Sequence, residues 1–459
     1  MATRYEKFTA ESVVKVNDQE HRATLRKNIG KYESTVPSGK EQYARLDLAR
    51  SRAAGLRSRV IENLDKYLIE FEANFIRRGG KIIWAQDAEE ANREIIALLR
   101  YKNVSSIVKS KSMVTEEIHL NDALSKNGIR SIETDLGEFI QQTDGEAPYH
   151  IVTPAMHKSK EDVASLFAGK LGAPAGMSPS EITAWTRAHL RKEFASAGAG
   201  ITGANFLIAE TGSVAVTENE GNAVMSVAFP KIHIVVTGIE KIIPSLYDLE
   251  IFWPLLSTYA TGQKIAAYNT IISGSAKQGE DGPGEMYIVL VDNGRSNVLA
   301  KTEQRRALSC IRCGACLNVC PVYETVGGHA YDAVYSGPIG SVLMQHLQPE
   351  QGYNYLSSAT TSCARCTENC PVNIDIHKLL LHNRHENATA GQSTKTENMM
   401  WFFWKGAMMK RSKMDKGRAK LKNFMLRQFF RKSWGDGREL PAVAPKSFNQ
   451  LWRERKGIR

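Results

Sequence analysis

The sequence has few cysteines, and most of its length has none: they are absent from the first 309 residues and from the last 89. Long apolar runs are absent too, because charged residues interrupt even the segment 239–256, so we expect no transmembrane helix. The first residues carry charges of both signs and lack the apolar core of a secretory signal. These absences predict a cytoplasmic protein without a disulfide framework.

Acidic residues are scarce at one end of the chain. Residues 401–459 contain 17 Lys and Arg against four Asp and Glu, a net charge of +13, so the other 400 residues carry −2 of the total of +11. A basic appendage does not imply a generally basic surface, and we expect no nucleic-acid partner. With 42% hydrophobic and 24% charged residues, the 459-residue chain fits about two to four globular units.

All seven cysteines lie between residues 310 and 370. The first four form the run Cys310-Ile-Arg-Cys313-Gly-Ala-Cys316-Leu-Asn-Val-Cys320-Pro, which matches C-x2-C-x2-C-x3-C-P at every position. In two-cluster ferredoxins, three thiolates of such a run bind one [4Fe-4S] cluster and the fourth binds the other cluster. The spacing therefore predicts an iron–sulfur module.

The remaining cysteines repeat the end of this motif. The run Cys363-Ala-Arg-Cys366-Thr-Glu-Asn-Cys370 is also followed by proline, but Thr360 occupies the position that corresponds to the first cysteine of the earlier run. The crosswise rule then predicts two sites of unequal size. The complete [4Fe-4S] site takes Cys310, Cys313, Cys316 and Cys370, and the second site keeps Cys320, Cys363 and Cys366.

The second site is one cysteine short, and several occupants remain open. Three thiolates fit a [3Fe-4S] cluster, or a [4Fe-4S] cluster whose fourth iron takes water, a group from a partner, or a hydroxyl of Thr360, Thr361 or Ser362. Zinc is an alternative for the whole region, because it also binds four-cysteine sites. Zinc ribbons usually separate their pairs by about 12 to 20 residues and follow no C-x3-C-P rule, so we favour iron.

Upstream of the cysteines, apolar residues alternate between helix and strand periods. Steps of three and four residues predict one long helix over 40–78, ended by Gly79 and Gly80. The order of the elements that follow predicts an α/β domain with a mostly parallel sheet, into which the strands 204–209 and 213–217 insert as an antiparallel pair. Further strands are predicted at 81–84, 104–108, 129–134, 150–152, 231–236 and 287–291, and helices at 88–100, 114–126, 159–170 and 180–196.

Polar loops at the ends of these strands are the candidate binding sites, because ligands of parallel α/β sheets bind beyond the carboxyl ends of strands. The segment 109–112 places two cations between a strand and a helix start, where free N–H groups favour an anion. We expect no flavin or nicotinamide site and assign no catalytic residue. The candidate anion or substrate residues are Lys109, Ser110, Lys111, Thr211, Gly212, Asn222 and Arg295.

These features together resemble the lactate utilization protein B family over nearly the whole chain. The resemblance rests on short segments spread over the α/β and cysteine-containing regions. They are Lys109-Ser-Lys-Ser-Met-Val-Thr-Glu-Glu117, Thr134-Asp-Leu-Gly-Glu138, Ile201-Thr-Gly203, Thr211-Gly-Ser213, Asn219-Glu-Gly-Asn222, Val291-Asp-Asn-Gly-Arg-Ser-Asn297, Val326-Gly-Gly-His329 and Tyr335-Ser-Gly-Pro-Ile-Gly340.

The resemblance implies an α/β LUD domain, similar to sugar-phosphate isomerase and CoA-transferase folds, followed by an α-helical dicluster ferredoxin-like module and a short C-terminal tail. It implies electron transfer during oxidation of L-lactate to pyruvate, in a cytoplasmic complex with a cysteine-rich iron–sulfur protein and a second LUD protein. A quinone-linked acceptor is a further candidate partner. Seven ligand cysteines, without an eighth, are typical of the family.

Two other functions remain open. A subunit serving another 2-hydroxy acid, such as glycolate, would share the mechanism and differ in its substrate. A redox- or metabolite-sensing protein would use the clusters to report oxygen and the α/β domain to bind a metabolite. If the substrate is lactate or another 2-hydroxy acid, the chain is an electron-carrier component of an oxidoreductase complex rather than a complete enzyme.

We expect four regions: a helical arm (1–58), the LUD domain (59–300), the iron–sulfur domain (301–386) and a basic, aromatic-rich region (387–459). In the last, the aromatic run 401–404 precedes many cations. Glycines and a proline interrupt any continuous amphipathic face, so docking onto an acidic partner is favoured over an anionic membrane surface or a solvated tail. At most peripheral membrane contact is expected.

Overall fold

The computed structural model describes residues 3–391, 395–410, 417–431 and 439–457. The chain divides into two compact units, Met1–His385 and Glu386–Arg459. The first unit contains the α/β domain and all seven cysteines. The described part of the second unit is helical, with α19 (Lys395–Met408), α21 (Ala419–Met425) and α23 (Phe448–Lys456).

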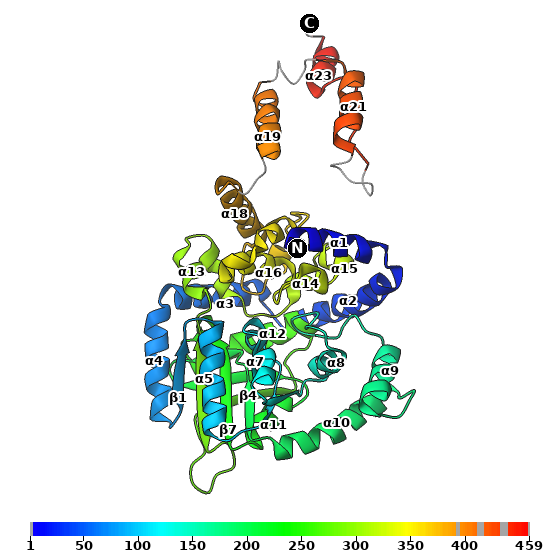
Figure 1. The fold of residues 1–459 in the computed structure, drawn as a ribbon. Coiled ribbons are helices and arrows are strands. Elements are labelled where there is room, and N and C mark those ends of the chain that lie inside the picture. Colours follow the sequence, from blue (N-terminus) through cyan, green and yellow to red (C-terminus); the bar gives the residue numbers. More distant parts are fainter. Residues whose placement is uncertain (1–2, 392–394, 411–416, 432–438, 458–459) are drawn as a thin grey trace. The chain divides into compact units, whose positions relative to one another are not determined.

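Six parallel strands form the central sheet, in the order β1-β10-β7-β4-β2-β3 (Figure 1). Every residue of β7 is buried, as expected for the middle of a parallel sheet covered on both faces. This arrangement confirms the predicted α/β domain with a mostly parallel sheet. The strands are β1 (Lys81–Ala85), β2 (Ser106–Lys109), β3 (Arg130–Glu133), β4 (Ala199–Thr202), β7 (Ile232–Gly238) and β10 (Glu285–Val291).

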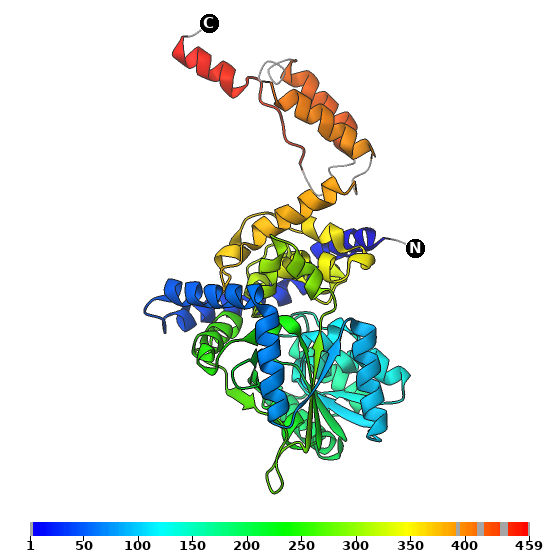
Figure 2. The same ribbon diagram turned by 90° about the vertical axis from the view of Figure 1, so that its left-hand side faces the viewer.

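Alternate residues of the central strands point to two different cores, as the period of a strand requires. On one face, Ile234 packs in a cluster with Ile95 and Leu99 of α5 (Ala88–Tyr101). On the other face, Val235 packs in a cluster with Phe71 of α4 (Leu64–Arg77). Figure 2 shows these two helices on opposite sides of the sheet.

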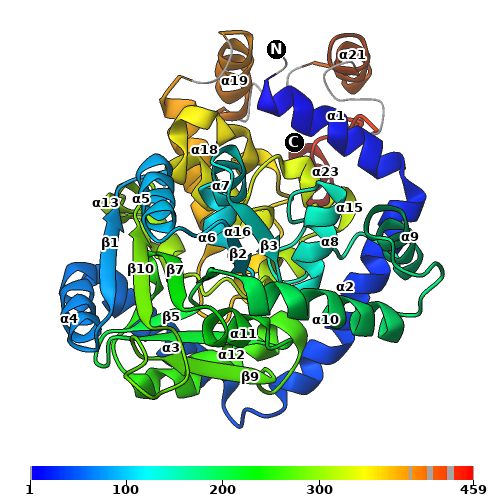
Figure 3. The same ribbon diagram turned by 60° about the horizontal axis from the view of Figure 1, so that its bottom comes forward.

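A second, four-stranded sheet has the order β8-β5-β6-β9. The predicted antiparallel pair is present as β5 (Phe206–Ile208) and β6 (Ser213–Glu218). β9 (Tyr268–Ile272) pairs antiparallel with β6, and the short β8 (Ile242–Ile243) pairs parallel with β5. Figure 3 shows β5 and β9 from below, together with β1, β10 and β7 of the central sheet.

The remaining helices surround these sheets and build the region of the cysteines. They are α1 (Arg4–Asn17), α2 (Gln19–Lys40), α3 (Leu46–Glu62), α6 (Met113–Glu117), α7 (Leu120–Lys126), α8 (Leu136–Asp144), α9 (Lys160–Leu171), α10 (Pro179–Ser196), α11 (Asn222–Ala228), α12 (Leu249–Thr261), α13 (Arg295–Ala300), α14 (Ala315–Asn318), α15 (Tyr323–Val326), α16 (Gly337–Leu347), α17 (Arg365–Glu368) and α18 (Ile376–Thr389).

The single long helix predicted over 40–78 is wrong, because the structure divides it. α2 ends at Lys40, and α3 and α4 are separated at Asn63, whose side chain donates to the carbonyl oxygen of Arg59. The break lets the two helices bury different contacts. α3 places Arg57 against the carbonyl groups before the cysteines, whereas α4 places Phe71 in the core beneath the sheet.

Two further predictions differ from the structure. Residues 150–152 form bends rather than a strand, because Nδ1 of His150 accepts hydrogen bonds from the N–H groups of Val152 and Thr153. The helix predicted over 114–126 is interrupted before α7, where His119 has a φ of 53°. In both places a local conformation replaces the regular hydrogen-bond pattern that the apolar residues suggested.

The central strand β4 was not predicted, because it is short and its first two residues, Ala and Gly, are depleted in strands. Gly200 is required by a close approach, since a Cβ atom there would lie 1.7 Å from the carbonyl oxygen of Ser226 in α11. Gly198, Gly200 and Gly203 have the spacing G-x-G-x-x-G, but the motif runs through the strand rather than opening a helix, as a dinucleotide-binding motif does.

Within the described ranges, no helix is long and apolar enough to cross a membrane.

Candidate functional site between the α/β domain and the cysteines

The carboxyl ends of the parallel strands meet at one edge of the central sheet. β2 ends at Lys109, β7 at Gly238 and β10 at Val291, so the loops that follow these strands lie at the same edge. The segment with the cysteines packs there as well, because Arg312 lines the same cavity as Ser110. This edge therefore combines the predicted ligand loops with the predicted cluster ligands.

Two of the predicted anion-binding cations are paired with carboxylates of the protein. Lys109 is fully buried, and its Nζ lies 2.8 Å from Glu133 Oε1. Arg295 is 1% exposed and donates to Glu117 Oε1 at 2.8 Å and to Glu240 Oε2 at 2.5 Å. Burial favours the neutral form of Glu117, but the charge of Arg295 outweighs this effect and lowers the pKa of the Glu117 carboxyl. Neither cation lies in the cavity lining.

Buried hydrogen bonds join this edge to the segment with the cysteines. Arg57 donates to the carbonyl oxygen of Ile242 at 2.7 Å and to that of Leu308 at 2.9 Å, directly before the first cysteine. Tyr335 donates to Glu117 Oε2 at 2.7 Å. Both side chains are 1% exposed, so the two regions share a polar interior rather than a solvated boundary.

The other predicted loop residues are separated by the fold. Thr211 and Gly212 form the β5–β6 turn, where Gly212 has a φ of +60° and a Cβ atom would lie 2.3 Å from the N atom of Phe75. This turn packs on α4 and does not line the cavity. Ser110, Lys111 and Asn222 do line it.

The cavity has a volume of about 350 Å³, which is within the usual range for a small-molecule site. The loop after β2, and the end of β6 with the loop that follows it, form one part of the cavity wall. α12 and the first cysteine run form another part. Its charged lining residues are Lys111, Asp135, Glu218, Glu220, Lys241 and Arg312.

Four cysteines lie around α14 and just after α17, where their thiols influence one another's pKa. Cys313, Cys316 and Cys370 are buried and Cys310 is half-buried. Burial raises the pKa of Cys313, and the neighbouring Cys310 and Cys370 raise it further. Burial and Cys310 raise the pKa of Cys370 to about 11. These four thiols are the set that the crosswise rule predicts for one cluster.

The other three cysteines form a second group beside α17. Burial raises the pKa of Cys366 to about 11, and Cys320 and Cys363 contribute to the increase. Cys363 is exposed, and a hydrogen bond with Thr361 lowers the pKa of its thiol. Thr360 is half-buried beside this group. Cys363 is therefore the exposed member of the second group, whereas Cys320 and Cys366 are as buried as most of the first group.

The backbone of the two cysteine runs is similar at equivalent positions. Gly314 and Ala364 each directly precede a four-residue helix. Both residues have a positive φ, of 75° and 64°. Arg312 and Ser362 also have positive φ, of 60° and 56°. Positive φ is unfavourable for residues other than glycine, so three of these four residues are held in a strained conformation that shapes the loop between cysteines.

The donor set fits iron–sulfur clusters. All seven cysteines have free thiols, and backbone N–H groups already point at two of the sulfur atoms: those of Arg312 and Ile374 donate to Sγ of Cys310 and Cys370, both at 3.3 Å. Such N–H···S hydrogen bonds stabilise thiolates and tune the reduction potential of bound clusters. Burial disfavours the free thiolates, and metal binding would offset this cost by displacing their protons.

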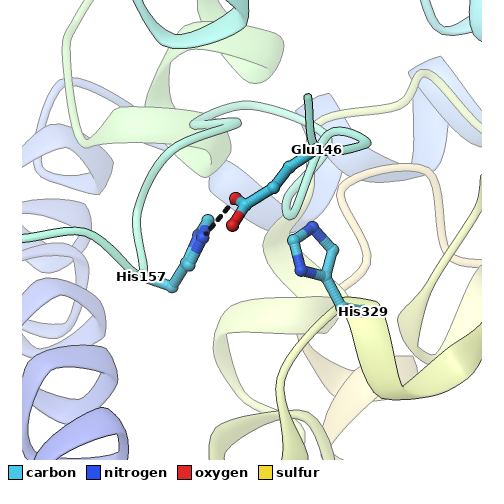
Figure 4. Close-up of side chains that lie close together, drawn as sticks. All are labelled: Glu146, His157 and His329. Atoms are coloured by element: carbon cyan, nitrogen blue, oxygen red, sulfur yellow. Dashed lines mark hydrogen bonds and ion pairs between the residues drawn. The ribbon is translucent and has the colours of Figure 1, made fainter. Parts of the chain in front are cut away.

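A histidine and carboxylate cluster lies at a different place, around Tyr149. Figure 4 shows Glu146 bonded to His157, with His329 beside them; their nearest ligand atoms lie within 4.8 Å of one another. Nζ of Lys158 lies 3.1 Å from the same Glu146 oxygen that contacts His157. His329 contacts the carbonyl oxygen of Ala147 at 2.7 Å. Because a lysine already neutralises the carboxylate, this cluster is an internal ion-pair network.

Comparison with known proteins agrees with this architecture. The family model of the LUD domain matches residues 68–291, and that of the 4Fe-4S dicluster domain matches residues 306–374. Lactate utilization protein B from Shouchella clausii (strain KSM-K16) is 43% identical over 421 residues, covering 89% of this chain and 88% of that protein. The chain belongs to the lactate utilization protein B family.

Two more members of the lactate utilization protein B family support this assignment. The protein from Anoxybacillus flavithermus (strain DSM 21510 / WK1) is 44% identical over 423 residues, covering 88% of this chain and 89% of that protein. The one from Geobacillus sp. (strain WCH70) is 49% identical over 337 residues, covering 72% and 71%. The expected family, LUD domain and dicluster domain are thereby confirmed.

Sequence reasoning missed several residues of this site. Lys241, Glu240 and Tyr335 were not candidates, although Lys241 lines the cavity and Tyr335 lies under the Arg312 guanidinium, 4.4 Å from it. One signal was present in the sequence: Glu240 and Lys241 interrupt an otherwise apolar segment. Charges that remain buried in such a segment need partners or a function, and here they face the cysteine run.

Proposed function

We propose that this chain is the iron–sulfur electron-transfer subunit of a complex that oxidises L-lactate to pyruvate. The names of its relatives indicate lactate utilization. A 4Fe-4S dicluster domain supports the electron-transfer role, because iron–sulfur clusters carry single electrons. The observation that carries the proposal is the position of Arg312. It belongs to the first cysteine run and also lines the cavity of the LUD domain, so a ligand there would lie next to the cluster ligands.

We propose a division of the cysteines into two sites. Iron–sulfur clusters accept one electron at a time, so two of them suit the two electrons released by a 2-hydroxy acid. The first site would hold a [4Fe-4S] cluster, and the second would hold a [3Fe-4S] cluster or a [4Fe-4S] cluster with a fourth ligand other than cysteine. The ligands of the first site would be Cys310, Cys313, Cys316 and Cys370. Those of the second site would be Cys320, Cys363 and Cys366.

The side chains around the first group of cysteines favour electron uptake. Four buried cations lie there with only two buried carboxylates, an excess of two positive charges. A positive surrounding stabilises the more negative, reduced form of a cluster and so raises its reduction potential. The cations are Arg57, Lys241, Arg295 and Arg312, and the carboxylates are Glu117 and Glu240.

The second group of cysteines is suited to electron exit, because Cys363 is exposed. We assign the acceptor to one of two partner proteins, a cysteine-rich iron–sulfur protein and a second LUD protein, or to a quinone-linked acceptor reached through them. The C-terminal unit is proposed to dock one of these partners. Its helix α19 exposes Trp401, Phe402, Phe403 and Trp404 in a strongly basic segment, a combination that suits an acidic protein surface.

Growth of a strain that lacks this protein tests the proposal and its closest alternative. We expect loss of growth on L-lactate as sole carbon source, unchanged growth on glycolate and glucose, and restoration by the wild-type gene. Restoration should fail with Cys316→Ser, which removes a buried predicted ligand, provided that equal protein amounts are present. Loss of growth on glycolate alone would identify a different 2-hydroxy acid. Normal growth on every acid would favour a sensing role.

A further inference from the structure

One part of the cavity wall holds buried cations with unused hydrogen-bond donors. Lys241 is 7% exposed, and its side chain forms no ion pair within the described part of the chain; burial lowers its pKa to about 8, so the amine is still mostly charged at pH 7. The Arg312 side chain is 9% exposed, and its Nε and Nη1 atoms have no hydrogen-bond partner among the same residues. Its one ion-pair contact, from Nη2 to Glu240 Oε1, is long at 3.6 Å.

A hydroxyl lies without a partner on the same cavity. Ser257 in α12 is 4% exposed and lines the cavity, and its Oγ has no hydrogen-bond partner within the described residues. Buried polar groups without partners are costly, especially when charged, and native proteins rarely retain them without a reason. Arg312 and Ser257 thus present unsatisfied donors to the cavity, and Lys241 adds an unpaired cation on the same wall, so a small anion with a second oxygen would find all its partners there.

The nearby thiols do not account for all of these donors. Negative charge at Cys310 would attract Lys241 and Arg312, but Ser257 carries no charge to balance. Nor would charge compensation require a cavity of about 350 Å³ at the same place. A ligand that occupies the cavity explains the donors and the space together.

We propose that this cavity binds a small monocarboxylate, a 2-hydroxy or 2-keto acid, with its carboxylate against Lys241 and Arg312 and its second oxygen beside Ser257. Arginine and lysine form charge-assisted hydrogen bonds with carboxylates, the strongest class available to this wall. The proposal deepens the proposed function and rests on it only for the choice of acid.

The other charged lining residues add a preference. Asp135, Glu218 and Glu220 form a separate acidic group on the cavity. Burial raises the pKa of Glu218 and of Glu220, and the charge of Asp135 raises both further. A dicarboxylate that places one carboxylate at the cations brings the second toward this group, where the charge of Asp135 repels it and Lys111 offsets part of the repulsion. The cavity is therefore selective for monocarboxylates over dicarboxylates of similar length.

Equilibrium dialysis of the full-length, anaerobically purified protein with both clusters, without partner proteins, tests this proposal. The ligands are radiolabelled L-lactate and pyruvate, with malate and inorganic phosphate as competitors. Lys241→Met should weaken binding of both acids about tenfold or more, Lys241→Arg should retain it, and Lys170→Met, on the exposed surface of α9, should leave it unchanged. Iron content and cluster spectra must match the wild type, which excludes misfolding.

The outcomes separate this inference from the proposed function. If Lys241→Met binds both acids as the wild type does and only shifts the reduction potential of a cluster, the lysine serves the cluster alone and the inference is wrong. The inference is also wrong if phosphate or malate displaces bound L-lactate or pyruvate at a lower concentration than unlabelled pyruvate or L-lactate does. A third outcome is that binding depends on Lys241 but L-lactate and the partner proteins fail to reduce the clusters of this protein. That outcome would support the inference and refute the proposed function.

Discussion

Arg295→Met tests the buried charge network that joins the LUD domain to the cysteines. The Arg295 guanidinium is 1% exposed and is shared by two carboxylates. Methionine would leave Glu117 without its cation and Glu240 with the more distant Arg312, 3.6 Å away, and the nearby Lys241. Removing one partner of a buried ion pair costs about 3–5 kcal/mol. At about 2.1 cal/mol/K of unfolding entropy per residue, the unit Met1–His385 would lose roughly 4–6 °C in Tm.

Circular dichroism of the anaerobic protein during heating measures this loss. The control is Arg130→Met, because Arg130 pairs with Glu193 but is 60% exposed, so its removal should cost less than about 1 kcal/mol. Adding Glu117→Gln to Arg295→Met should recover part of the lost stability, since an unpaired buried charge is removed. A Tm for Arg295→Met no lower than that of the control would refute the reasoning.

Three further predictions concern the clusters, pH and the C-terminal unit. Cys370→Ser and Cys310→Ser should deplete the same cluster in electron paramagnetic resonance spectra, and Cys320→Ser the other; a shared loss with Cys320→Ser would show that the crosswise assignment is wrong. Burial lowers the pKa of His233 to about 3, so its contribution to stability is complete above pH 6.5 and declines as pH falls toward 3. His233 should therefore lower the free energy of unfolding by about 1 kcal/mol between pH 6.5 and 5.5, in addition to what His150 and His21 contribute in the same window, and His233→Gln should remove that part of the slope. Deleting residues 386–459 should abolish co-purification with the partner proteins while iron content stays unchanged; normal assembly of the truncated protein would contradict docking through this unit.

The fold could be predicted where the apolar pattern alone determined the local structure. The strand β1, the helix α5 and the β5–β6 pair have strong periods and clear turns, and their positions agree with prediction. Predictions failed where side chains replaced backbone hydrogen bonds, as at His150, or where packing overrode propensity, as at Gly200. Neither the imidazole's bond to its own chain nor the approach of α11 to β4 is visible in a one-dimensional pattern.

The candidate site divides in the same way. Cysteine spacing is a local property, so the predicted grouping of the ligands follows from the sequence without any tertiary structure. The cavity is not local: Ser257, Lys241 and Arg312 come from a helix, the 3-10 turn after β7 and the cysteine loop. Lys109 and Arg295 looked like free cations because their carboxylate partners are distant in sequence or belong to other elements. Tertiary structure alone decides which charges are neutralised.

The most direct test of the proposed electron-transfer role is the reduction of this protein's clusters by substrate. The purified, oxidised protein would be mixed anaerobically with its two partner proteins and L-lactate, and its clusters followed by electron paramagnetic resonance in rapidly frozen samples. We predict reduction of both clusters with formation of pyruvate, no reduction by glycolate, and slower reduction in Lys241→Met. Clusters that stay oxidised while the partners convert L-lactate to pyruvate would contradict an electron-transfer role for this chain.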